Sequence, residues 1–317
     1  MTSSTGLFSG YSRSSALTIK AGISETYKIF RSILDDLQAL QDEMNAESDS
    51  EYASRLGRLL SDWKGISKTY TLMLWQARYV ASRARVASEE FLTSTYAIDS
   101  TMNPASFRPD LGNYSMTDLQ VSSREIIDEL TALSTHVDDF YNTFSQIWPD
   151  EHLNSPHETY STFLGKSPVT RLCKSIRELH LQLLSMLNRI RRVSMICVEG
   201  GANAISLDLD FSFRNAQAEN VGGGERFYVA PQSPAFAEIT SHLSIVLSIW
   251  AAVQADLDFV NKSYLNAMCT TIEPHMDPVF MERIRMCRNM YSSLSIRFLD
   301  FEAGVRDDTP ILKRRVP

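Results

Sequence analysis

Residues 51–91 read EYASRLGRLLSDWKGISKTYTLMLWQARYVASRARVASEEF, and this stretch decides the fold class. Its apolar residues recur in alternating steps of three and four, which is the heptad pattern of helices that pack along their whole length. The positions of this seam are Tyr52, Leu56, Leu59, Trp63, Ile66, Tyr70, Met73, Ala77, Val80, Ala84, Ala87 and Phe91. We predict one helix over residues 51–97, which at ~1.5 Å per residue would be roughly 70 Å long. A helix of that length requires an elongated domain.

The same heptad spacing occurs in five further stretches. Their apolar seams cover residues 19–44, 119–147, 169–197, 236–267 and 280–305. A period of about 3.5 residues keeps neighbouring helices in contact through a left-handed supercoil. The sequence therefore predicts an all-α fold, an elongated antiparallel bundle of long heptad-patterned helices with one small β-hairpin insert.

Proline positions mark the ends of these helices. All 11 prolines lie outside the six stretches, and residues 167–168 and 233–234 each place a serine N-cap before proline at the first helical position. Every helical stretch has an apolar face that needs its neighbours, so we expect a single bundle domain over residues 15–305. Residues 1–14 are predicted to be a flexible N-terminal segment, and residues 306–317 a C-terminal tail.

Residues 200–231 break the helical pattern. They read GGANAISLDLDFSFRNAQAENVGGGERFYVAP, in which apolar and polar residues alternate with the period of a strand. We predict a β-hairpin, which we call the tongue. A lone hairpin is marginally stable in water, so its apolar face must dock on the bundle, on another protomer or on a membrane. The predicted membrane-binding or partner-binding residues are Ile205, Leu207, Leu209, Phe211, Phe213, Phe227 and Val229. The predicted hinges of the tongue are Gly200, Gly201 and Pro231.

Charge and cysteine content bear on the class of function. The chain of 317 residues has 31 Lys and Arg against 38 Asp and Glu, a net charge of −7, which does not favour binding to nucleic acid. Its first residues show no apolar run typical of a signal peptide. We expect a soluble protein that is cytoplasmic or released without a standard signal peptide. This expectation is compatible with a second, membrane-bound form. The four cysteines show no paired spacing and are expected to be reduced.

No stretch carries the sequence motif of an enzyme. The chain has no nucleophile elbow, no glycine-rich phosphate loop and no paired-histidine zinc motif. His152 and His157 share an acidic loop whose spacing matches no metal template, while His136, His180 and His242 are expected at the edges of helices. We therefore predict no catalytic residues, no metal site and no cofactor, and a protein that is not an enzyme.

Residues 239–255 carry no charge, which raises the question of a membrane-spanning helix. Six polar residues interrupt this apolar run, whereas a spanning helix needs ~20 predominantly apolar residues. The six are Thr240, Ser241, His242, Ser244, Ser248 and Gln254. We therefore predict a buried helix of the bundle here.

Residues 243–267, LSIVLSIWAAVQADLDFVNKSYLNA, follow the tongue. Long heptad helices, a tongue between two of them and a following helix of this form resemble the α-helical pore-forming toxins of the cytolysin A and haemolysin BL type. The resemblance covers the arrangement of most of the chain, with its nearest local match around Trp250, Leu257 and Val260. It implies that the tongue enters a bilayer and that helix rearrangement and oligomerisation build a pore.

Two functions remain open. The other face of the tongue is polar, with Asp208, Asp210 and Arg214, so the first expectation includes a pore-forming protein and a non-inserting component of one. Either would be a non-enzymatic, membrane-associating or oligomerising helical protein. Its partner would be a lipid membrane or a protein bound through the tongue, with homo- or hetero-oligomers expected and no nucleic acid. The alternative is an intracellular helical scaffold or adaptor that binds a protein partner.

Overall fold

The computed structural model describes residues 12–46, 50–101, 113–147, 168–201, 234–270 and 278–307, and in these ranges it contains six α-helices and no strand. The helices are α1 (Ser12–Ala46), α2 (Ser50–Thr101), α3 (Asn113–Ile147), α5 (Pro168–Gly200), α7 (Pro234–Thr270) and α8 (Pro278–Asp307). Each predicted heptad stretch falls on one helix, and α5 and α7 begin at the two prolines expected to start them. The prediction of an all-α fold is confirmed over the described residues.

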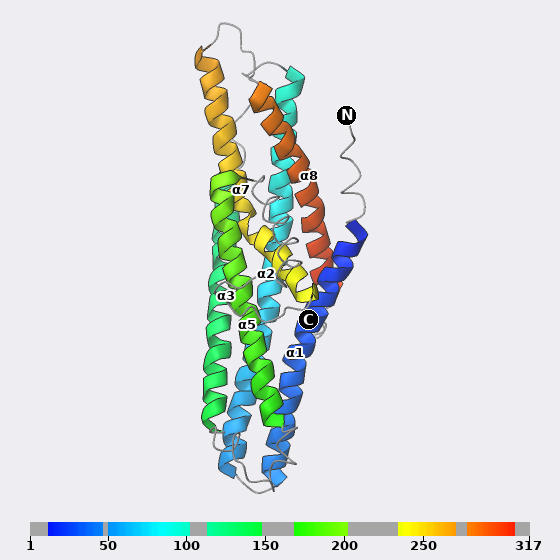
Figure 1. The fold of residues 1–317 in the computed structure, drawn as a ribbon, viewed down its shortest axis with the longest axis vertical. Helices are drawn as coiled ribbons and strands as arrows, with labels where there is room; N and C mark the ends of the chain where they lie inside the picture. The colour runs from blue at the N-terminus through cyan, green and yellow to red at the C-terminus, as the bar shows by residue number, and fades with distance from the viewer. Residues whose placement is uncertain are drawn as a thin grey trace, which may run out of the picture.

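The helices lie side by side along one long axis, and α2 extends over most of its length (Figure 1). α2 and α3 run in opposite directions. The Gln76 side chain donates a hydrogen bond to Glu129 at 3.1 Å, and Arg83 forms an ion pair with Asp118 at 3.3 Å. Residue numbers rise along α2 as they fall along α3, so the two helices are antiparallel. The colours of Figure 1 show the same opposition for α1 and α2, and for α2 and α8.

α5 and α7 run in the same direction, which departs from the predicted antiparallel order. The hydroxyl oxygens of Ser194 and Ser248 lie 2.7 Å apart, and Arg189 donates to the Ser241 hydroxyl at 3.5 Å. Residue numbers rise together in these pairs, as they do between parallel helices. A short loop would force two consecutive helices into opposite directions, whereas the long stretch between Gly201 and α7 imposes no such constraint.

The predicted seams form the core of the bundle. Seam residues are buried from Ile19 near the start of α1 to Val305 near the end of α8. The clearest exception is Tyr52, the first seam position of α2, which is 39% exposed. Each helix therefore turns its heptad stripe toward its neighbours, as the period of the apolar residues predicts.

α7 is buried on nearly all sides over residues 239–253. Ile245, Leu247 and Ile249 are buried in addition to its seam, and α7 packs against each of the other five described helices. This burial places the uncharged stretch in the interior, so the prediction of a buried bundle helix is confirmed. Over Phe236–Ser263 its length and mean hydropathy of 1.6 are also sufficient to cross a membrane, although 67% of the apolar window is buried within the bundle.

Several predicted features lie outside the described residues. They include the tongue residues Ile205, Leu207, Leu209, Phe211, Phe213, Phe227 and Val229, together with Pro231. The loop histidines His152 and His157 also lie outside the described ranges. Of the three predicted hinges, Gly200 and Gly201 are described.

Candidate functional site at the end of α5

The end of α5 is closed by a glycine cap. Gly201 follows the last helical residue and has a φ of 61°, in the left-handed region that glycine adopts without steric strain. Its N–H group donates a hydrogen bond to the carbonyl oxygen of Cys197 at 3.0 Å. This is the αL type of helix C-cap, in which the residue after the helix closes the last turn. The chain therefore leaves α5 in a defined direction.

Gly201 lies directly against Asp256 of α7. A Cβ atom added to Gly201 would overlap Oδ1 of Asp256 and would lie 2.6 Å from its Cγ atom. Such a contact is too close for two carbon atoms, whose optimal separation is about 3.5–4.0 Å. The backbone angle and the neighbouring carboxyl group therefore both require glycine at this position.

The carboxyl group of Asp256 also contacts α8. Asp256 is 0% exposed, and the Tyr291 hydroxyl group donates a hydrogen bond to its Oδ2 atom at 2.9 Å. The Cys287 thiol interacts with the same carboxyl group. Burial, and then the nearby Asp256, raise the pKa of Tyr291 well above its usual value and the pKa of Cys287 to about 12. Both groups therefore stay protonated at neutral pH and face Asp256 as donors. We call Gly201, Asp256, Cys287 and Tyr291 the junction cluster.

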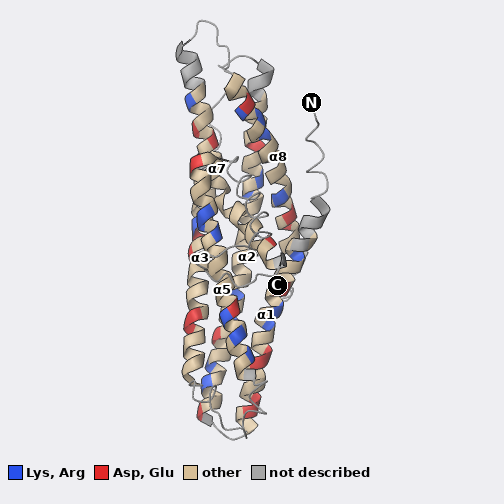
Figure 2. Ribbon diagram, viewed as in Figure 1, with Lys and Arg blue, Asp and Glu red and all other residues tan. Residues whose placement is uncertain are grey.

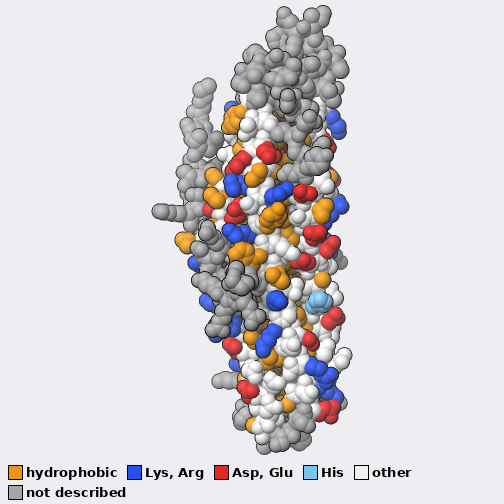
Figure 3. All heavy atoms as spheres, turned by 180° about the vertical axis from the view of Figure 1, so that it is seen from behind, with side chains coloured by type: hydrophobic (Ala, Val, Ile, Leu, Met, Phe, Trp, Pro, Cys, Tyr) orange, Lys and Arg blue, Asp and Glu red, His pale blue; other side chains and the backbone are white. Residues whose placement is uncertain are grey.

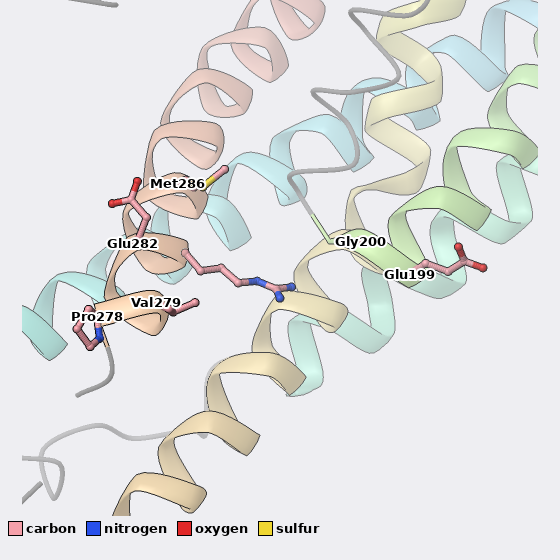
Figure 4. A pocket seen from close by; sticks show the side chains of 7 residues that line it. Glu199, Gly200, Pro278, Val279, Glu282 and Met286 are labelled. Atoms are coloured by element: carbon pink, nitrogen blue, oxygen red, sulfur yellow. The ribbon is translucent and has the colours of Figure 1, made fainter. Parts of the chain in front are cut away.

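An open groove of about 650 Å³ lies between the end of α5 and the start of α8 (Figure 4). Its lining residues are Glu199, Gly200, Pro278, Val279, Glu282, Arg283 and Met286. The Arg283 guanidinium group lies over the Phe259 ring, 3.7 Å from the ring centre, in a cation–π contact. Met195 and Val198, on the last two turns of α5, are 70% and 60% exposed. The end of α5 is thus packed against α7 and borders an open groove toward α8.

His242 lies inside the bundle, so the expectation that it sits at a helix edge is wrong. It is 3% exposed, and its Nδ1 atom lies 3.0 Å from the carbonyl oxygen of Glu238. Burial and, to a smaller extent, the positive charge of Arg297 lower the pKa of His242 to about 4, against the opposing effect of its hydrogen bond with the Glu238 backbone. Burial also raises the pKa of the Glu238 carboxyl group, against the opposing effect of Arg297 and Arg189. The edge prediction failed because α7, buried on nearly all sides, leaves His242 no exposed edge to occupy.

The remaining surface offers weaker candidates. Among the described residues Cys173, Cys197 and Cys287 form no disulfide, and no group of three His, Cys, Asp or Glu side chains there could hold a metal ion. Basic and acidic residues are mixed along the helices in Figure 2. Figure 3, from behind, shows apolar side chains singly or in small groups between charged ones. The junction cluster is therefore the most distinctive arrangement of polar groups in the described part of the chain.

Comparison of the chain with protein-family models, with curated proteins and with solved structures finds no match. Function is therefore inferred from the arrangement of the chain's own residues.

The sequence pointed to one member of the junction cluster. Gly201 is a predicted hinge, whereas Cys287 and Tyr291 fall within the predicted seam of residues 280–305 and Asp256 directly follows the uncharged residues 239–255. One carboxylate within a long apolar helix was the signal available for finding the site. That signal could not identify Tyr291 as its partner, because the pairing depends on how α7 and α8 cross.

Proposed function

We propose that this chain is a non-enzymatic helical protein that associates with a membrane and oligomerises, like an α-pore-forming toxin of the cytolysin A type or a non-inserting component of one. In this proposal the tongue leaves the bundle and the helices rearrange about Gly200, Gly201 and Pro231. The apolar face of the tongue is then buried in lipid or in a partner subunit. That face consists of Ile205, Leu207, Leu209, Phe211, Phe213, Phe227 and Val229.

The character of α7 is the observation that carries this proposal. α7 follows the tongue in the chain, and its apolar stretch over Phe236–Ser263 has the length and hydropathy of a membrane-crossing helix. It is enclosed by the other five described helices. A bundle that encloses such a helix has a second apolar surface to offer a bilayer once the helices separate.

The contacts between α5 and α7 also support a rearrangement. These two helices flank the tongue, and several of their contacts are polar. Ser248 is fully buried, its hydroxyl group lies 2.7 Å from that of Ser194, and Arg189 reaches Ser241. A hydroxyl pair contributes about 1 kcal/mol net, less than a buried pair of large apolar side chains. These polar contacts therefore contribute less to the α5–α7 interface than apolar pairs at the same positions would.

The proposal is tested with two charged variants of the tongue. If the apolar face is buried outside the monomer, Leu209→Asp and Phe211→Asp should abolish flotation on liposomes and leave the melting temperature nearly unchanged, because a charge in lipid is costly. Ser212→Asp, on the opposite face of the predicted strand, is the matched control and should still float. Loss of stability in the first two variants, with no flotation of the wild-type protein, would contradict membrane association.

A second function, a scaffold that binds a helical partner, is favoured by a different observation. Leu72, Tyr79 and Val86 recur at heptad spacing on α2, and they are 45%, 57% and 40% exposed. An exposed heptad stripe is suited to packing against another helix. If this stripe mediates assembly, replacing its three residues with serine should reduce the sedimenting mass of the protein in solution. A wild-type protein that assembles through this stripe and does not bind liposomes would favour the scaffold.

A further inference from the structure

We infer that the junction cluster is a latch, which holds the end of α5 against α7 and α8 and opens locally before the bundle unfolds. The inference depends on contacts among described residues and is independent of membrane binding. Asp256 connects three helices, because its carboxyl group touches the cap of α5 at Gly201 and accepts the hydroxyl hydrogen bond from Tyr291 of α8.

A buried carboxylate is a poor choice where packing alone matters. Removing a carboxyl group from water is costly, and even buried ion pairs can often be replaced with apolar residues of similar size without loss of stability. What Asp256 adds is direction, since its oxygen accepts a hydrogen bond at a defined angle from Tyr291. The position of Tyr291 on α8 thus controls where the carboxyl group lies, and the carboxyl group controls where Gly201 can lie.

The last two turns of α5 have few other contacts. Between Ser194 and Gly200, Cys197 is the one buried side chain, while Met195 and Val198 are largely exposed. The open groove lies on the side toward α8. Segments with few buried apolar contacts open at lower free energy than the core of a domain. The end of α5 is therefore attached mainly through the buried Cys197, the junction cluster and the contacts to α7 beside it.

The steric contact makes the latch cooperative. A Cβ atom would not fit between Gly201 and Asp256, so the carboxyl group cannot turn toward the cap while the cap stays in place. Loss of the Tyr291 hydrogen bond removes one of the two donors that hold the Asp256 carboxyl group, the other being the Cys287 thiol, and we expect the contact between this carboxyl group and the cap to loosen. Displacement of α8 is transmitted in this way to the point where the chain leaves α5.

Hydrogen exchange of the full-length protein, read by mass spectrometry, tests the latch. Tyr291→Phe removes the hydroxyl group and keeps the ring, and we expect amides in residues 194–201 to exchange about tenfold faster or more. Exchange in the α2 segment around Trp63 should stay unchanged. Tyr27→Phe is the matched control, since it removes a hydroxyl hydrogen bond to Thr71 at 3.1 Å between α1 and α2. That variant should leave residues 194–201 unaffected.

Asp256→Asn provides the second arm, because it keeps the shape of the side chain and weakens it as an acceptor. It should accelerate exchange in the same segment. Unchanged exchange in residues 194–201 in both variants would overturn the latch. A uniform acceleration over all helices would also overturn it, because the cluster would then be an ordinary part of the core. If Asp256→Asn does not fold, the Tyr291→Phe result decides alone.

Discussion

Two buried regions of the bundle differ in what holds them together. In the first, Trp63 of α2 lies between Phe30 of α1 and Phe140 of α3, with ring centres 5.4 and 4.9 Å away. The Trp63 indole N–H group donates to the backbone carbonyl of Phe30 at 3.0 Å, so its polar atom is satisfied. We call these three residues the aromatic layer. In the second region, the junction cluster, the Asp256 carboxyl group faces the Tyr291 hydroxyl group and the Cys287 thiol as donors. The same carboxyl group packs against the glycine cap of α5.

The aromatic layer and the junction cluster therefore have different roles, the first in stability and the second in positioning. The aromatic layer stabilises through buried area and dispersion, which are largely non-directional and are lost in proportion to the atoms removed. The junction cluster buries less apolar surface, but its contacts depend on angle and on the absence of a single Cβ atom. We therefore expect the aromatic layer to determine the free energy of unfolding of the bundle, and the junction cluster to determine where the end of α5 lies.

The largest effect should come from the aromatic layer. Trp63→Ala should lower the free energy of unfolding by roughly 3–5 kcal/mol, because the helices cannot close fully over the cavity. Urea unfolding measures this loss. Trp63→Phe should retain most of the stability, since an aromatic ring remains. A change within ~0.5 kcal/mol for the alanine variant would mean that this layer does not form the core.

Gly201→Ala should have the next largest effect. We expect a loss of about 2–4 kcal/mol, from the left-handed backbone angle and from the overlap with Asp256. The loss should be accompanied by altered exchange in the last turns of α5 and by little change around Trp63. Wild-type stability in this variant would show that the cap and the carboxyl group are not in contact.

Acidification should weaken the bundle through His242. The folded pKa of His242 is lowered to about 4 by burial, against about 6.5 in an unfolded chain. Between these values the unfolded chain binds a proton that the folded protein does not, so this contribution is fully present above pH 6.5 and is lost as the pH falls toward 4. The loss between pH 7 and pH 5 should be about 2 kcal/mol.

The His242 contribution is isolated by comparing two variants across that pH range. Glu238 has a raised pKa and acts in the opposite sense, adding stability as the pH falls. His242→Gln should therefore reduce the acid-induced loss of stability. His136→Gln, which changes an exposed residue, should leave that loss unchanged. Equal pH dependence of wild type and His242→Gln would exclude His242 as the cause.

The smallest effect should be a gain. Gly65 lies within α2, and a Cβ atom added there would meet nothing within 4 Å. Gly65→Ala should raise stability by roughly 0.5–1 kcal/mol, because alanine loses less backbone entropy in a helix than glycine. Thermal unfolding of this variant beside Gly201→Ala compares two glycines that differ in backbone angle and in surroundings. A destabilised Gly65→Ala would indicate a contact on this face of α2.

The helices and the core were predictable because the apolar period is a local property of the sequence. Trp63 and Tyr291 were correctly expected to be buried from spacing alone. The parallel direction of α5 and α7 was not predictable, since it depends on packing between distant segments. His242 was misjudged because a position relative to one seam says nothing about the other faces of a helix buried on nearly all sides. Asp256 could not be identified from sequence because its partners, Gly201 after α5 and Tyr291 of α8, come from other parts of the chain.

A disulfide crosslink between α5 and α7 tests most directly whether these two helices separate when the protein binds a membrane. The hydroxyl oxygens of Ser194 and Ser248 lie 2.7 Å apart, so Ser194→Cys with Ser248→Cys should place two thiols within bonding reach. Peptide mapping would verify the bond. We expect the oxidised double variant neither to permeabilise liposomes nor to oligomerise on them, and reduction to restore both. If the oxidised form permeabilised liposomes and oligomerised on them as well as the reduced form does, separation of α5 and α7 would not be required.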